Sequence, residues 1–153
     1  MGGKRSSMEL TKILMGETVF FDASPFIYYF EDKQPYGDLL APIFLGLKNG
    51  SIDVVSSLIT VSEVLTLPYR RGQWDLIKTY SEVFGHQSNI EVLPMTLETA
   101  NLTAQIRGKY GLKTPDAIQW ATATLHGVDY FLTNDQGFKI LNDDRILIID
   151  EYI

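Results

Sequence analysis

Short apolar runs alternate with helical patterns along most of this chain, and that alternation constrains the fold more than any other feature. Strands are predicted at residues 18–21, 52–55, 91–93, 130–133 and 146–149. Segments with helical periodicity separate most of these runs. Because strands that alternate with helices form parallel sheets covered on both faces, we predict a three-layer α/β/α fold with a mostly parallel central sheet.

The predicted helices have recognisable start and stop signals. They begin near Ser24 and cover residues 38–48, 57–67, 73–84, 96–110 and 114–126. Ser24 and Pro25 are typical of an N-cap followed by the first helical residue. Pro68 is expected to bend or end its helix, since it lacks a backbone N–H. Gly111 and Gly127 are natural helix stops.

The composition fits one globular domain. The chain has 153 residues, of which 45% are hydrophobic and 21% charged, enough for a sizeable core. Its apolar runs are too short to cross a bilayer. The first eight residues, MGGKRSSM, lack the apolar stretch of a secretory signal, so we interpret residues 1–8 as a disordered leader or cloning remnant and residues 9–153 as the domain. The absence of Cys agrees with a cytoplasmic protein.

The net charge is unfavourable for binding nucleic acid. It is −6 for the whole chain, and without Lys4 and Arg5 it is −8 over residues 9–153. Phosphate backbones attract Lys and Arg, so an RNA substrate would require local basic patches or a bound cation. The candidate patches are Arg70, Arg71, Arg107, Lys109 and Lys113.

Four carboxylates occupy distinctive positions on this pattern. Asp22 and Asp135 each follow a predicted strand, so both are expected at the carboxyl edge of the sheet, where α/β proteins bind ligands. Asp116 is the second residue of a predicted helix, where the helix dipole favours an anion. Glu63 lies in the middle of another helix. All four side chains could therefore converge.

Each acid also has a purely structural explanation. Asp22 would be a turn residue at a strand end, Asp116 a dipole partner and Asp135 a cap. Glu63 fits such a role least well, because Ile59 and Leu67 place it on a largely apolar face. Taken together, the acids favour a metal site, since clustered carboxylates repel one another unless a hard cation such as Mg²⁺ or Mn²⁺ gathers them.

Four segments of the chain resemble the PIN domain family, and in particular its VapC-type ribonuclease toxins. They are DAS at residues 22–24, SEVL at 62–65, KYGLKTPDAIQWATA at 109–123 and FLTND at 131–135. The resemblance implies that the acidic positions of the family are Asp22, Glu63, Asp116 and Asp135, with the hydroxyl of Thr133 beside them. One departure is Gly137, where many relatives carry an acid, so Asp135 has to supply the fourth charge.

This resemblance implies a divalent-metal-dependent endoribonuclease. It also implies two partners, a small antitoxin that blocks the acidic pocket and a second copy of the chain in a homodimer. For the mechanism we expect Asp22 and Asp116 to make the central contacts to Mg²⁺ or Mn²⁺. Asp135 and Glu63 would bind the metal directly or through water. Thr133, with Asn134 as a further candidate, would orient the attacking water or a phosphate oxygen.

Three alternatives stay open at this stage. A non-catalytic module with the PIN fold would use the acids to receive a basic partner segment, and a stand-alone PIN nuclease would act in RNA processing without an antitoxin. A phospho-acceptor receiver domain fits less well, because it needs paired acids after the first strand. His86 and His126 lack the spacing of a zinc site. The aromatics of residues 20–30 are expected in the core or a dimer contact, with base stacking as the less favoured use.

Overall fold

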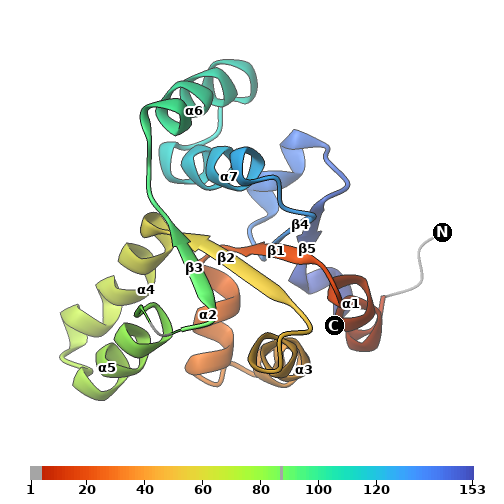
Figure 1. The fold of residues 1–153 in the computed structure, drawn as a ribbon, viewed down its shortest axis with the longest axis vertical. Coiled ribbons are helices and arrows are strands. Elements are labelled where there is room, and N and C mark those ends of the chain that lie inside the picture. Colours follow the sequence, from red (N-terminus) through yellow and green to blue (C-terminus); the bar gives the residue numbers. More distant parts are fainter. Residues whose placement is uncertain (1–4, 87) are drawn as a thin grey trace.

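A five-stranded sheet forms the middle layer of the molecule (Figure 1). The computed structural model describes residues 5–86 and 88–153. The strands are β1 (Thr18–Phe21), β2 (Asp53–Ser57), β3 (Ile90–Leu93), β4 (Tyr130–Thr133) and β5 (Ile146–Ile148), in the spatial order β3-β2-β1-β4-β5. Every neighbouring pair is parallel. The predicted α/β/α fold is therefore confirmed, and the sheet is parallel throughout.

Helices cover both faces of this sheet (Figure 1). One face carries α6 (Leu97–Tyr110), α7 (Thr114–His126) and the 3₁₀ helix η1 (Gln136–Leu141). The other carries α1 (Ser7–Leu14), α2 (Ala23–Phe30), α3 (Tyr36–Lys48), α4 (Leu58–Arg71), α5 (Trp74–Val83) and the 3₁₀ helix η2 (Ile149–Tyr152). Among residues 5–86 and 88–153, no helix is long and apolar enough to cross a membrane.

The core is split by the sheet into two clusters, and β1 contributes to both. Val19 and Phe21 pack on the side of α2 and α3, whereas Phe20 packs on the side of α7. Phe20 stacks on Phe131 of β4 with 5.0 Å between ring centroids. Burial on both faces explains why the strands read as continuous apolar runs rather than as alternating patterns.

The expectation of a disordered leader is wrong from Ser6 onward. Ser6 caps α1 by accepting a hydrogen bond from the backbone N–H of Glu9 at 3.2 Å, and Leu10 and Leu14 of this helix are fully buried. Arg5 donates to the hydroxyl of Tyr152 at 2.9 Å. The apolar side of α1 therefore belongs to the core. The part of that expectation concerning residues 1–4 lies outside the described residues.

Two predicted helix boundaries also differ. Pro68 does not end α4, which continues to Arg71 and stops at Gly72 with a left-handed φ of 64°. Pro68 is buried there, so packing outweighs the loss of one helical hydrogen bond. The N-cap of α2 is Asp22 rather than Ser24. Pro25 still lies in the first turn, where backbone N–H groups have no partner within the helix.

Candidate active site

Asp22 is the buried centre of the acidic cluster. It follows β1, and the register that pairs Phe21 with Leu132 places it beside the end of β4. One carboxylate oxygen, Oδ1, accepts from the N–H of Ser24 at 3.0 Å, and Oδ2 accepts from the hydroxyl of Thr133. Asp22 is only 7% exposed. Burial raises its pKa to about 7, against the opposing effect of these two hydrogen bonds and with the help of Glu63 and Asp135.

Asp135 is tied to the same hydroxyl. Its backbone N–H donates to Thr133 Oγ1 at 3.0 Å, so Thr133 connects Asp22 with Asp135. Asp135 also caps η1, because its Oδ1 accepts from the N–H of Gly137 at 2.8 Å. A Cβ at position 137 would lie 3.0 Å from that oxygen. The glycine that departs from the family pattern thus leaves room for the close approach of Asp135.

Glu63 and Asp116 come from two helices, α4 and α7. Asp116 is the third residue of α7 and half-buried; its pKa is raised by burial and then by Asp135, while Lys113 lowers it. The pKa of Glu63 is raised by partial loss of water contact and by the negative charges of Asp116 and Asp135. Within residues 5–86 and 88–153, neither carboxylate accepts a side-chain or backbone hydrogen bond.

The surroundings of Glu63 differ from the apolar face that the sequence predicts. Glu63 is itself exposed, Ile59 is half-buried, and Leu67 is 38% exposed. Only Thr60, Val64 and Pro68 of α4 are buried. Leu67 is therefore exposed and Ile59 only partly covered, so the position of Glu63 in the helix does not by itself show that it is enclosed.

The four acids nevertheless act on one another. Asp22 is influenced by Glu63 and Asp135, Glu63 by Asp116 and Asp135, and Asp116 by Asp135. Within the described part of the chain, no group of three or more Asp, Glu, His or Cys side chains is arranged so that it could hold a metal ion. The donor set consists of carboxylate oxygens alone, which suits Mg²⁺ or Mn²⁺. Their mutual repulsion is the property that a divalent cation would relieve.

Asn134 is used within the fold. Its Nδ2 donates to the hydroxyl of Tyr28 at 3.1 Å, and its Oδ1 accepts from the N–H of Asp150 at 2.8 Å. The side chain of Asp150 accepts from Tyr36 at 2.7 Å, and the rings of Tyr28 and Tyr36 stack at 4.1 Å. These contacts link the ends of β4 and β5 to α2 and α3. They direct the Asn134 amide towards Tyr28 and Asp150, which argues against a role in orienting water.

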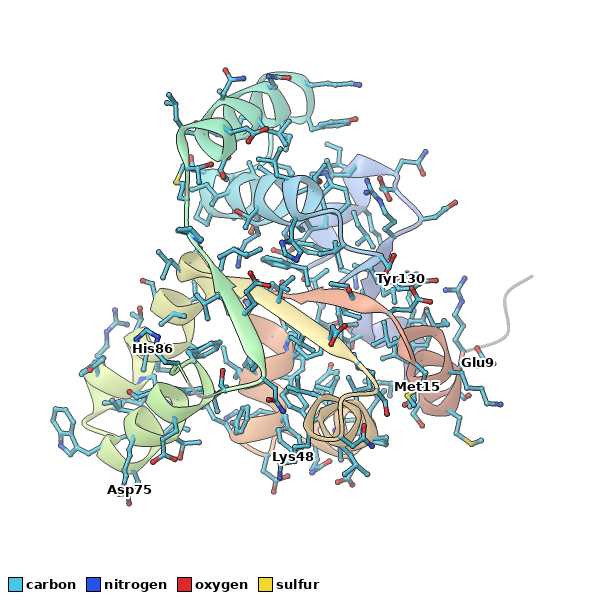
Figure 2. The ribbon with its side chains drawn as sticks, viewed as in Figure 1. Glu9, Met15, Lys48, Asp75, His86 and Tyr130 are labelled. Atoms are coloured by element: carbon cyan, nitrogen blue, oxygen red, sulfur yellow. The ribbon has the colours of Figure 1, made fainter. Side chains whose placement is uncertain are left out.

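The histidines and the basic residues contribute little to the acidic cluster. His126 lies 4.0 Å from Glu91 on the β3 side, and His86 lies beside α5 (Figure 2). Among the described residues, Lys113 is the one cation that alters the pKa of these acids. The guanidinium of Arg107 donates instead to the carbonyl of Leu112 at 3.4 Å.

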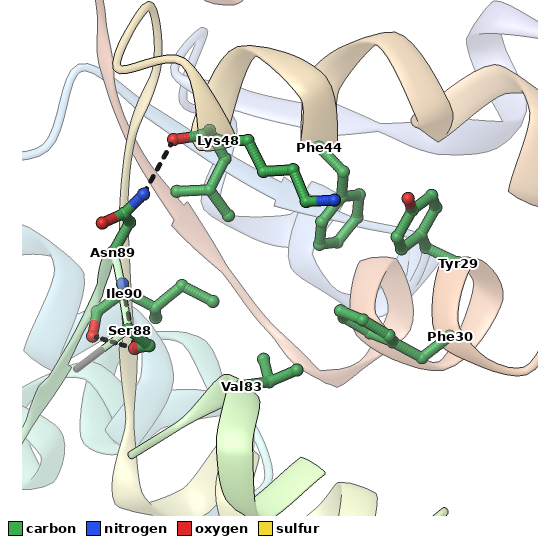
Figure 3. Close-up of a pocket in the computed structure, with 9 residues that line it drawn as sticks. Tyr29, Phe30, Phe44, Lys48, Val83, Ser88, Asn89 and Ile90 are labelled. Carbon is green, nitrogen blue, oxygen red and sulfur yellow. Dashed lines mark hydrogen bonds between the residues drawn. The ribbon is translucent and has the colours of Figure 1, made fainter. Parts of the chain in front are cut away.

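A separate cavity of about 240 Å³ lies between α2, α3, α5 and β3 (Figure 3). Its lining residues are mostly apolar: Tyr29, Phe30, Phe44, Leu47, Lys48, Val83, Ser88, Asn89 and Ile90. In Figure 3 the side chain of Lys48 extends along the cavity beside Phe44. No carboxylate is among the described residues of the lining. This cavity therefore suits apolar groups better than a metal ion.

The model of the PIN domain family matches residues 19–143, a range that includes all four acids. The chain belongs to the PIN domain family. Comparison with curated protein sequences gives no significant match.

Solved structures show the same PIN-like fold. A toxin-antitoxin complex from Klebsiella pneumoniae contains a chain with 21% identity and a TM-score of 0.64, and the match covers 86% of this PIN domain chain and 97% of that chain. VapC20 of Mycobacterium tuberculosis, a sarcin-ricin loop cleaving toxin, has 15% identity, coverages of 80% and 94%, and a TM-score of 0.64. A DNA-bound VapBC complex from Salmonella typhimurium has 21% identity, coverages of 87% and 98%, and a TM-score of 0.62.

Proposed function

We propose that this PIN domain is a divalent-metal-dependent endoribonuclease that hydrolyses RNA phosphodiester bonds. The observation that carries the proposal is the set of four carboxylates at one edge of the sheet, because the pKa values of Asp22, Glu63 and Asp116 are each raised in part by the negative charge of other acids in the set. Mg²⁺ or Mn²⁺ would be held by Asp22, Asp116, Asp135 and Glu63. The cation would lower the pKa of a bound water and neutralise charge that develops on the phosphate.

The protein's own contribution is to hold the acids in place. Hydrogen bonds from Ser24 and Thr133 fix the direction of both Asp22 oxygens, and Thr133 also accepts the backbone N–H of Asp135. Lys113, which lowers the pKa of Asp116, supplies a positive charge near the site. A phosphate of the RNA would meet that charge despite the net charge of −6.

The most specific biological role we propose is that of a toxin restrained by an antitoxin. The similar chains from Klebsiella pneumoniae and Salmonella typhimurium come from toxin-antitoxin complexes, which supports such a partner here. An Arg or Lys side chain of that partner, placed among the four acids, would neutralise part of their negative charge and exclude a metal ion. We also propose that the chain forms a homodimer, for which mass measurement in solution is the direct test.

The nuclease proposal is tested with purified protein, a structured RNA, and Mn²⁺ or Mg²⁺. Asp116→Asn keeps the size of the side chain but removes its charge, so we expect cleavage to fall by at least about 100-fold. Asp75→Asn is the matched control, because Asp75 is exposed in the first turn of α5, away from α7 (Figure 2). EDTA should abolish cleavage by the unaltered protein.

Cleavage by Asp116→Asn at the rate of Asp75→Asn would contradict the proposal, and so would cleavage that persists in EDTA. If the unaltered protein fails to cleave RNA with either metal but binds an Arg-rich peptide through Asp116, the chain is a non-catalytic binding module instead.

A further inference from the structure

Three buried polar side chains connect α4 with α7 beneath the acidic site. Ser57 ends β2 and caps α4, Thr60 lies in the first turn of α4, and Gln119 lies in α7. Their exposed fractions are 2%, 0% and 2%. The hydroxyl of Ser57 donates to Gln119 Oε1, and Gln119 Nε2 donates to Thr60 Oγ1 at 2.6 Å. The side chain of Gln119 therefore bridges the two ends of the first turn of α4.

The hydrogen bonds around Ser57 determine which way the Gln119 amide points. Ser57 Oγ accepts from the N–H groups of Ile59 at 3.1 Å and Thr60 at 3.3 Å. Both of its lone pairs are thus used, and its single hydrogen needs an acceptor. Only the oxygen of the amide can serve, so the nitrogen has to face Thr60. Exchange of the two amide atoms would leave a buried group without a partner.

The bridge lies one helical turn from two of the acids. Glu63 follows Thr60 by three residues, and Asp116 precedes Gln119 by three residues. Residues three apart lie on the same side of a helix. The chain therefore runs from Thr60 to Glu63 along α4 while the facing stretch of α7 runs back from Gln119 to Asp116. The contact between Thr60 and Gln119 therefore brings Glu63 and Asp116 towards each other.

We propose that Gln119 is a positioning residue that fixes α4 against α7 and thereby sets the separation of the Glu63 and Asp116 carboxylates. These two carboxylates accept no hydrogen bond within the described residues, and the negative charge of Asp116 raises the pKa of Glu63, as expected for two like charges that repel each other. The Gln119 bridge opposes that repulsion. The inference rests on the proposed metal-dependent function, since the separation of the two acids determines how well they share a divalent cation.

The test measures Mn²⁺ binding by calorimetry, together with thermal unfolding. Gln119→Met keeps the length of the side chain and removes both hydrogen bonds. Thr60→Val removes only the hydrogen bond between Gln119 and Thr60, whereas Thr60→Ser keeps the hydroxyl. We expect Gln119→Met and Thr60→Val each to weaken Mn²⁺ binding by about 10-fold, the double variant to lose little more, and Thr60→Ser to bind as the unaltered protein does.

Thr122→Val is the matched control for a general weakening of α7. Thr122 is buried in the same helix, but its hydroxyl donates within α7, to the Ile118 carbonyl at 2.7 Å. We expect its Mn²⁺ affinity to be unchanged even where its unfolding temperature falls. A purely structural role of Gln119 would give the same result for Gln119→Met, with a lower unfolding temperature and unchanged Mn²⁺ affinity.

Asp116→Asn separates failure of this inference from failure of the proposed function. If Asp116→Asn loses Mn²⁺ binding while Gln119→Met retains it, the positioning role is wrong and the metal site stands. If the unaltered protein does not bind Mn²⁺, or if Asp116→Asn binds it with unchanged affinity, Mn²⁺ does not bind at this site. The positioning role and the proposed function are then both wrong. Should Gln119→Met not fold, the comparison of Thr60→Val with Thr60→Ser decides.

Discussion

The acidic site has two halves that are held in different ways. The half that follows the strands comprises Asp22, Thr133 and Asp135, joined through one buried hydroxyl. The half on the helices comprises Glu63 and Asp116, whose carboxylates accept no hydrogen bond from the described residues. Sheet register positions the first half. The second depends on how α4 packs against α7, so the two halves should respond differently to pH and to mutation.

The largest effect expected from this comparison is a loss of stability as pH rises in metal-free protein. Because the pKa of Asp22 is raised from 3.8 to about 7 on folding, the folded state binds a proton that the unfolded chain has released. This contribution to stability is fully present below pH 3.8 and is lost as the pH rises to about 7. The free energy of unfolding should fall by roughly 4 kcal/mol at most over that range. Urea unfolding in EDTA between pH 4 and pH 8 measures it.

Asp22→Asn is the control for that experiment. The variant should lose the part of the pH dependence that Asp22 causes and be more stable than the unaltered protein at pH 8. Mn²⁺ should stabilise the unaltered protein more at pH 8 than at pH 5, because the metal competes with protons for the carboxylates. Equal pH dependence in both proteins would show that Asp22 is not the group concerned.

The next effect concerns the hydroxyl that joins the strand half. Thr133→Val leaves Asp22 Oδ2 and the Asp135 N–H without this partner, so we expect a loss of about 1–3 kcal/mol in the free energy of unfolding. The pKa of Asp22 should rise further, since Thr133 lowers it. Thr103→Val removes a buried hydroxyl within α6 alone and is the comparison. An equal loss in both variants would contradict a special role for Thr133.

The smallest effect on stability is expected in the helix half. Glu63 is exposed and accepts no hydrogen bond in the described structure, so Glu63→Gln should change the free energy of unfolding by less than about 0.5 kcal/mol. Its Mn²⁺ affinity should nevertheless fall, because one carboxylate is lost from the proposed shell. A large change in stability, measured by urea unfolding, would show that Glu63 is held by more than its helix.

The fold and the strand half could be predicted from local patterns. Apolar runs marked the five strands, and parallel strands present their carboxyl ends at one edge, which placed Asp22 and Asp135 together. The missed helix α1 also had a local signal, a Ser6 cap followed three residues later by Glu9. The polar appearance of the first eight residues hid it.

The helix half was less predictable, for a physical reason. Whether Glu63 is covered depends on which elements pack against α4, and its own segment does not determine that. Likewise, Ser57 and Gln119 are 62 residues apart in the sequence, so neither local segment predicts their hydrogen bond. Whether the metal binds as proposed stays a prediction for all four acids.

The contact between Asp22 and Thr133 also favours the correct register between β1 and β4. A slip of β1 by one residue would exchange Phe20 and Phe21 between the two sides of the sheet and separate the carboxylate from the hydroxyl. Both polar groups would then be buried alone, so misaligned chains are penalised twice, through packing and through solvation. Asp22, which is proposed to bind the metal, and Thr133 thus also help β1 and β4 to pair in the correct register as the sheet forms.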